Sequence, residues 1–143
     1  VHQVVRYLGL DLGSRTLGVA VSDVTGTIAS NYGVIRHNEE YSSLIPKIQE
    51  IVKEKKVDEI VLGLPKNMNN TIGEKGNLSI WFQHELESHL GLPVHLIDER
   101  LTTVQAQHVL LQNDTSRKKR RQVVDGVAAT IILQSYLDQK GRI

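Results

Sequence analysis

The sequence predicts an α/β fold in which a mixed five-stranded sheet is flanked by helices. In the first quarter of the chain, apolar residues alternate with small or polar ones at the two-residue period of strands. Later segments alternate short apolar runs with stretches of helical period, and such strand–helix–strand connections imply parallel pairing. Hydrophobic residues make up 40% of 143 residues, enough for a folded core. We therefore expect a single domain over residues 1–143.

The first three strands are expected to form an antiparallel meander. Residues 4–13 alternate, with the leucines on one face, and residues 17–24 alternate in the same way. The short link at Ser14-Arg15 predicts a hairpin between them. Residues 27–37 are expected to form the third strand.

The remaining elements are expected to alternate helix and strand. In order they are a helix over 42–55, a strand over 60–64, a helix over 78–90, a strand over 94–97, and helices over 102–111 and 122–139. Residues 66–76 are polar and rich in Asn and Gly, which predicts a loop. Residues 113–121 are interpreted as a polar, basic connection.

Three carboxylates stand out because of where they fall. Asp11 lies inside the first strand, opposite the leucines and beside glycines that leave an open floor, and an acid there is costly without a partner. Glu99 follows the strand over 94–97, and ligands collect at the carboxyl ends of parallel strands. Asp125 precedes Ala128-Ala129, whose small side chains allow a close helix approach.

Each acid alone also fits a structural role. Asp11 could cap the following turn, Glu99 could belong to a charged strand-to-helix turn, and Asp125 could favour a helix dipole. Taken together they are oxygen ligands suited to Mg²⁺ or Mn²⁺. Two such ions are the usual machinery of phosphodiester hydrolysis. The chain has no cysteine, which excludes thiolate metal sites, disulfides and a cysteine nucleophile.

Four blocks of sequence carry a family resemblance. They are GLDLGSRTLGVAVSD at 9–23, GLPKNM at 63–68, DERLTT at 98–103 followed by Ala106, and Val124-Asp125 with Ala128-Ala129 and Ile132-Leu133. In this order the blocks resemble the YqgF family, also called RuvX. Its members are named as pre-16S rRNA nucleases or Holliday junction resolvases. The resemblance covers almost the whole chain.

The resemblance implies a ribonuclease H-like fold and a metal-dependent nuclease. It implies that Asp11, Glu99 and Asp125 are the catalytic carboxylates that bind Mg²⁺ or Mn²⁺ in a two-metal site. It places the second acid at the end of the fourth strand, which is assigned to Glu99, with Asp98 left open as a substitute. The expected role is 5′-end processing of precursor 16S rRNA, with junction-resolving DNA endonuclease as the alternative.

Basic residues near the proposed site are expected to contact the nucleic-acid backbone. They are Arg15, Arg100, Arg117, Lys118, Lys119, Arg120 and Arg121, with Lys66 and Lys75, which flank the expected loop after the fourth strand, as weaker candidates. Phosphate contacts from Lys and Arg supply most of the affinity of a non-specific binder. The run at 117–121 could instead be a solvated loop. The formal net charge of only +1 gives no whole-molecule signal for nucleic acid.

Parts of the sequence also fit two other classes of function, a nucleotide-binding kinase or ATPase and a non-catalytic RNA-binding factor. The hairpin at 11–14 resembles the phosphate-binding hairpin of actin-like kinases, but those enzymes enclose a nucleotide between two such domains, whereas this chain supplies one. A non-catalytic RNA-binding assembly factor would gain little from acids clustered near phosphates.

The sequence also predicts the surroundings in which the protein acts. Its first residues show no signal peptide, and no apolar run approaches the ~20 residues of a membrane span. We therefore expect a cytoplasmic protein without a membrane partner. It would act on structured RNA, or on branched DNA, as a monomer or weak homodimer.

Overall fold

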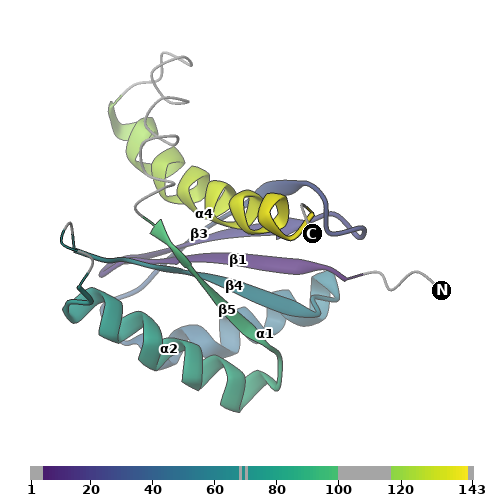
Figure 1. The fold of residues 1–143 in the computed structure, drawn as a ribbon. Helices are drawn as coiled ribbons and strands as arrows, with labels where there is room; N and C mark the ends of the chain where they lie inside the picture. The colour runs from purple at the N-terminus through teal and green to yellow at the C-terminus, as the bar shows by residue number, and fades with distance from the viewer. Residues whose placement is uncertain (1–4, 68, 70, 100–116, 142–143) are drawn as a thin grey trace.

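The computed structural model describes residues 5–67, 69, 71–99 and 117–141, with side chains from 127 to 140 in the last range. The elements are β1 (Tyr7–Leu12), β2 (Thr16–Ser22), β3 (Ala29–Arg36), η1 (Tyr41–Ser43), α1 (Leu44–Lys55), β4 (Glu59–Leu64), α2 (Glu74–Leu90), β5 (Val94–Asp98) and α4 (Arg117–Gly141) (Figure 1). Within these ranges, no helix is both long and apolar enough to cross a membrane.

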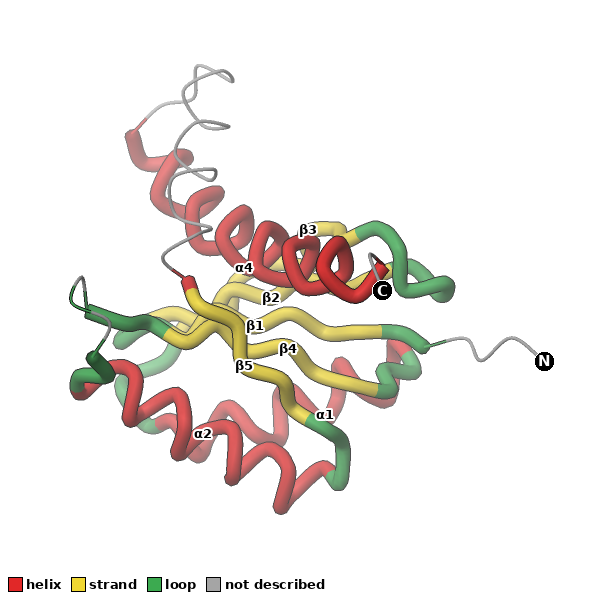
Figure 2. The backbone as a smooth tube through the Cα atoms, viewed as in Figure 1, coloured by secondary structure: helices red, strands yellow, loops and turns green. Residues whose placement is uncertain are grey.

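The sheet has the mixed topology that the sequence predicts. Its strand order is β3-β2-β1-β4-β5. The pairs β1–β2 and β2–β3 are antiparallel, whereas β1–β4 and β4–β5 are parallel. Helices α1 and α2 cover one face and α4 covers the other (Figure 2). The carboxyl ends of β1, β4 and β5 therefore meet at one border of the sheet, at the left of Figure 1, which we call the carboxyl edge.

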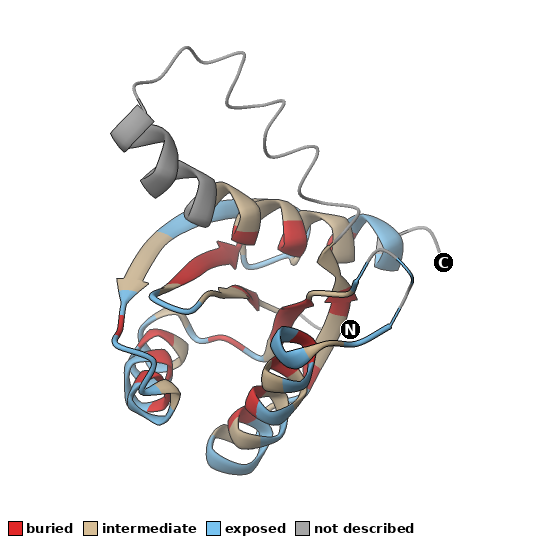
Figure 3. Cartoon of the chain, turned by 90° about the vertical axis from the view of Figure 1, so that its left-hand side faces the viewer, coloured by how far each residue is buried: buried red, intermediate tan, exposed pale blue. Residues whose placement is uncertain are grey.

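Two apolar clusters follow from the alternation of side chains along the strands. Leu8 and Leu10 of β1 belong to a buried cluster that contains Ile48 of α1 and Phe82 of α2. Tyr7, on the opposite face of β1, belongs to a second cluster formed with α4. The leucine face predicted from the sequence is thus confirmed, and the other face carries Asp11 (Figure 3 shows burial along the chain).

Helix α4 lies unusually close to β1 because Gly9 has no side chain. A Cβ atom at Gly9 would lie 2.7 Å from the Leu133 Cβ and 3.0 Å from the Ala129 carbonyl oxygen. The expected open floor beside Asp11 is therefore wrong at Gly9, since α4 covers it. The helix that carries Asp125 is held against the strand that carries Asp11.

Two helix boundaries differ from those expected. Helix α2 begins at Glu74 inside the expected loop, because Gly73 caps it and Asn77 N–H bonds to the Gly73 carbonyl. Helix α4 begins at Arg117, so the basic run has a helical backbone and is not a connecting loop. Lys and Arg are good helix formers, which explains the longer helix. The helix expected over 102–111 lies outside the described residues.

Substituting Gly9 with alanine should loosen α4. The added methyl must displace Leu133 or the helix backbone, so we expect the free energy of unfolding to fall by about 1–3 kcal/mol. Urea denaturation followed by circular dichroism measures this. Ser30→Thr also adds one methyl group, at an exposed strand position, and should change stability by less than about 0.5 kcal/mol. Equal stability of Gly9→Ala and the wild type would contradict the close packing.

Candidate active site

Asp11 and Glu99 meet at the carboxyl edge. Asp11 lies near the end of β1, and Glu99 directly follows β5. Ile97 belongs to the apolar cluster on the α4 face, so alternation directs Glu99 to that face and Asp98 to the other. The Glu99 carboxyl group is hydrogen-bonded to that of Asp11. We call these two groups the carboxyl pair.

The contact between the two acids crosses an intervening strand. Strand β4 lies between β1 and β5, which sets the outer two strands about 10 Å apart. Gly63 of β4 pairs with Ile97 in the register and lies beneath the Glu99 side chain. A Cβ atom at Gly63 would be 2.7 Å from the Glu99 Cγ and 2.8 Å from its carboxyl carbon. The open floor therefore exists at Gly63, where it lets Glu99 reach Asp11.

The surroundings of Glu99 favour its protonated form. Burial is the main cause that raises the pKa of Glu99 to about 9, and the hydrogen bond to Asp11 and the charge of Asp11 raise it further. Asp98 adds to this rise, whereas the positive charge of Lys75 opposes it. At neutral pH the Glu99 hydroxyl therefore donates to the Asp11 carboxylate, because two adjacent carboxylates resist ionising together. A cation could replace that shared proton.

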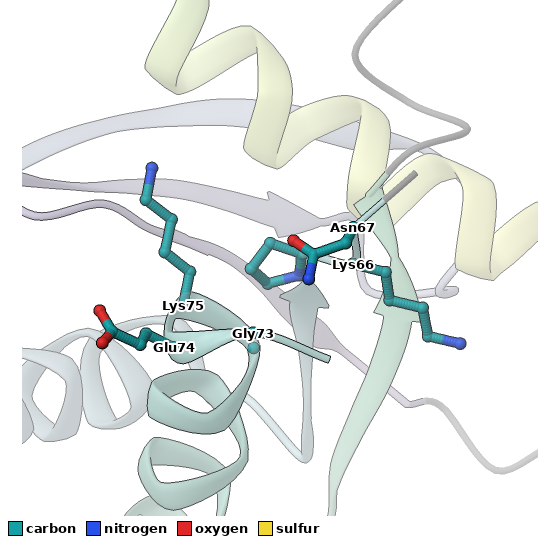
Figure 4. A pocket seen from close by; sticks show the side chains of 7 residues that line it. Lys66, Asn67, Gly73, Glu74 and Lys75 are labelled. Carbon is teal, nitrogen blue, oxygen red and sulfur yellow. The ribbon is translucent and has the colours of Figure 1, made fainter. Parts of the chain in front are cut away.

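Lys66 and Lys75 line a cavity at the carboxyl edge. The cavity has a volume of about 320 Å³ and is formed by the residues after β4 and the first turn of α2. Figure 4 shows the side chains of the two lysines pointing in different directions. Lys75 is the lysine whose charge acts on Glu99. The structure thus associates Lys75 with the carboxyl pair more directly than Lys66.

Arg15 lies in the hairpin that follows Asp11. Its side chain is exposed, and its Nε is 3.7 Å from a carboxylate oxygen of Glu39. The Arg15 carbonyl accepts a hydrogen bond of 2.9 Å from the backbone N–H of His37. This bond ties the β1–β2 hairpin to the end of β3. Arg15 is therefore at the same edge as the carboxyl pair.

Several predicted site residues lie outside what the structure describes. Arg100 is one of them. Asp125 and the run 117–121 lie on α4, but their side chains are not described. Asp125 is one helical turn before Ala129, which packs on Gly9. Among the described side chains, no three His, Asp or Glu residues form a group that could hold a metal ion.

Sequence reasoning missed part of this geometry. Gly63 lies in a recognised block, but only its position beneath Glu99 explains why a side chain would not fit there. A glycine inside an otherwise apolar strand is the signal that could have identified it. Lys75, which was expected in a loop, lies in the first turn of α2, and its charge acts on Glu99. The family resemblance placed the second acid at the end of the fourth strand, and this was wrong. Glu99 follows β5, the fifth strand in chain order, although it lies at the carboxyl end of a strand as expected.

Glu99 should make stability depend on pH in metal-free buffer. Because its folded-state pKa of about 9 exceeds the usual 4.5, the folded protein binds this proton more tightly than the unfolded chain. The free energy of unfolding should therefore fall as pH rises from 4.5 to about 9. Thermal melts in chelator, across that range, measure the fall. Glu99→Gln cannot ionise and should lack it; parallel curves for both proteins would contradict the assignment.

Gly63→Ala should separate the carboxyl pair. The new methyl group occupies the space of the Glu99 side chain, so the pKa of Glu99 should return toward its ordinary range. Carboxyl-carbon NMR titration of the ¹³C-labelled protein reads this directly. Ser30→Ala, at an exposed position on β3, serves as the control and should leave the titration unchanged. A Glu99 titration unaltered by Gly63→Ala would rule out the steric role of this glycine.

Solved structures resemble this fold. RuvC of Thermus thermophilus in complex with a Holliday junction substrate matches with a TM-score of 0.62 and 15% identity, covering 96% of both chains. A second Thermus thermophilus RuvC structure matches with a TM-score of 0.58 and 13% identity, covering 95% of this chain and 96% of that one. At these identities the likeness shows the fold alone, and it confirms the ribonuclease H-like architecture.

Relatives of known name are much closer in sequence. A Geobacillus sp. (strain WCH70) protein is 51% identical over 137 residues, covering 95% of this chain and 99% of its own. A Lacticaseibacillus casei (strain BL23) protein is 50% identical over 139 residues, covering 96% of each. Both are named "Putative pre-16S rRNA nuclease". Residues 5–139 match the family RuvX, described as Holliday junction resolvase. This chain belongs to the RuvX family, as its four sequence blocks predicted.

Proposed function

We propose that the protein is a nuclease that hydrolyses phosphodiester bonds in the 5′-end processing of precursor 16S rRNA. The observation that carries this proposal is the carboxyl pair, which two separate strands hold together at the carboxyl edge. Membership of the RuvX family and the names of relatives about half identical to this chain support it. Asp11, Glu99 and Asp125 are proposed as the catalytic carboxylates.

The carboxyl pair has the chemistry expected of a divalent-cation site. Its donors are hard oxygens, which suit Mg²⁺ or Mn²⁺. The half-buried Glu99 shares a proton with Asp11, and a cation there would replace it and relieve the repulsion of two carboxylates. Asp125 is proposed as the third ligand because α4 is held close to β1. When bound, such cations supply charge to stabilise the phosphodiester and lower the pKa of an attacking water.

The chain's own residues then divide the remaining work. Pairing of β1 with β2 and β4 fixes Asp11 before any substrate binds. The positive charge of Lys75 favours ionised Glu99 and is available to a phosphate oxygen. Arg15, Lys66, Arg100 and the residues 117–121 are proposed to hold the substrate backbone.

The substrate of this chemistry is proposed to be structured RNA. The names of the relatives favour precursor 16S rRNA, whereas the family description favours a Holliday junction as the alternative. A non-catalytic RNA-binding assembly factor is the third candidate. We propose that the chain works as one domain in the cytoplasm, as a monomer or weak homodimer.

Asp11→Asn should abolish cleavage while leaving the fold intact. Asparagine keeps the size of the side chain but removes the charge of a proposed ligand. The rate should therefore fall more than about 100-fold, which is the largest loss usual for a residue that only supports a metal ligand. The assay incubates end-labelled precursor 16S RNA and a four-way DNA junction in parallel, with Mn²⁺, Mg²⁺ or chelator. Circular dichroism checks the fold.

Asp138→Asn, at an exposed carboxylate on α4, is the matched control and should cleave normally. Cleavage of only the junction would favour the resolvase. Binding without cleavage by the wild type would favour the assembly factor. Undiminished cleavage by Asp11→Asn would remove the catalytic assignment.

A further inference from the structure

A second basic feature lies at the carboxyl edge, away from the carboxyl pair. Arg15, Arg36, His37 and Asn38 line a cavity of about 460 Å³ between the β1–β2 hairpin and the end of β3. We call it the hairpin pocket. The sequence pattern alone assigns no function to Arg36 or Asn38. The pocket brings guanidinium groups from two separate segments to one cavity.

The strand register places Arg36, the arginine of the hairpin pocket on β3, on the same face as Asp11. Asp11 pairs with Gly18 of β2, and Arg36 pairs with Thr16, two residues further toward the hairpin. Ile35 packs against the apolar cluster on the opposite face, so its neighbour Arg36 lies on the face of Asp11. Arg36 is therefore about 10 Å across the sheet and about 7 Å along it from Asp11. A strand of nucleic acid bound at the carboxyl pair could reach it.

His37 shapes the pocket and is not free to bind a ligand itself. It is buried, and its Nε2 lies 2.9 Å from the Gly13 carbonyl oxygen. Its Nδ1 accepts a hydrogen bond of 3.0 Å from the Glu39 N–H. Both bonds are satisfied by the neutral ring with its hydrogen on Nε2. His37 thus fixes the hairpin that carries Arg15 against the end of β3, where Arg36 lies.

The pocket carries more positive than negative charge. Arg15 pairs with Glu39 at 3.7 Å, but their side chains are 75% and 59% exposed, and exposed pairs of this kind are weak. No carboxylate of the described residues forms an ion pair with Arg36, whose side chain is exposed. The ion pair between Arg15 and Glu39 is therefore weak, and a phosphate group could displace the Glu39 carboxylate from Arg15.

We propose that the hairpin pocket binds a phosphodiester group of the nucleic-acid backbone, in the part of the strand that flanks the cleaved bond. Arg36 and Arg15 contact the phosphate, because a planar guanidinium matches two phosphate oxygens at once. Glu39 competes with that phosphate for Arg15. The inference rests on the proposed nuclease function and adds a binding subsite to it.

The test measures binding without cleavage. A fluorescently labelled single-stranded RNA and a four-way DNA junction are titrated in chelator, by anisotropy, over a series of salt concentrations. Arg36→Gln should weaken binding, and the slope of log affinity against log salt should become shallower by about 0.7 for RNA or 0.9 for duplex DNA, the value for one phosphate. Glu39→Gln should strengthen binding. Lys53→Gln, exposed on α1 in the other layer, should change neither slope.

An unchanged salt slope in Arg36→Gln would overturn the proposal and make Arg36 an ordinary solvated cation. A second experiment adds inorganic phosphate as a competitor of nucleic-acid binding, with a chloride control of the same ionic strength. Arg36-dependent competition by phosphate without any change of salt slope would also overturn it, in favour of a free-anion site. Binding is measured in chelator and so does not depend on cleavage. If the salt slope depends on Arg36 but the wild-type protein never cleaves RNA or DNA, the nuclease function is refuted and the phosphate-binding role of the hairpin pocket is retained.

Discussion

The hydrogen bond between Glu99 and Asp11 is the interaction on which the proposed site depends. It joins the ends of two strands that are not neighbours, and it passes over Gly63 of the strand between them. Parallel pairing brings both carboxyl groups to the same edge, and burial makes it unfavourable for both to be charged. In the absence of a metal ion, a proton shared by Glu99 and Asp11 therefore reduces the negative charge of the pair, as a bound cation would.

Glycines on two adjacent central strands prepare this arrangement. Gly63 leaves room for a side chain, whereas Gly9 leaves room for a helix. The second contact holds α4 against β1 through Ala129 and Leu133, one and two turns after Asp125. The contact between α4 and β1 and the carboxyl pair thus lie on the same face of the sheet. Arg36 of the hairpin pocket lies on that same face, on β3.

Much of this fold could be predicted from the sequence because its strands alternate cleanly. The alternation in β1 assigns the leucines to one face and Asp11 to the other. Short apolar runs predict β4 and β5, the two later strands of the parallel part of the sheet. The reach of Glu99 across β4 could not be predicted, because it depends on register between strands far apart in sequence. The position of Lys75 on α2 could not be predicted, because the glycines at the start of this helix resemble a loop in the sequence. The start of α4 also resembles a loop in the sequence, because its charged residues form no apolar stripe.

Proton release on metal binding tests the central claim most directly. Ligands must lose their protons to bind a cation, and Glu99 with a pKa of about 9 carries one at neutral pH. Calorimetric titration with Mn²⁺ at pH 7, in buffers of different ionisation enthalpy, counts the protons released. The account predicts release of close to one proton by the wild type that is absent in Glu99→Gln. Equal release by both proteins, or Mn²⁺ binding that is indifferent to Asp11→Asn, would contradict it.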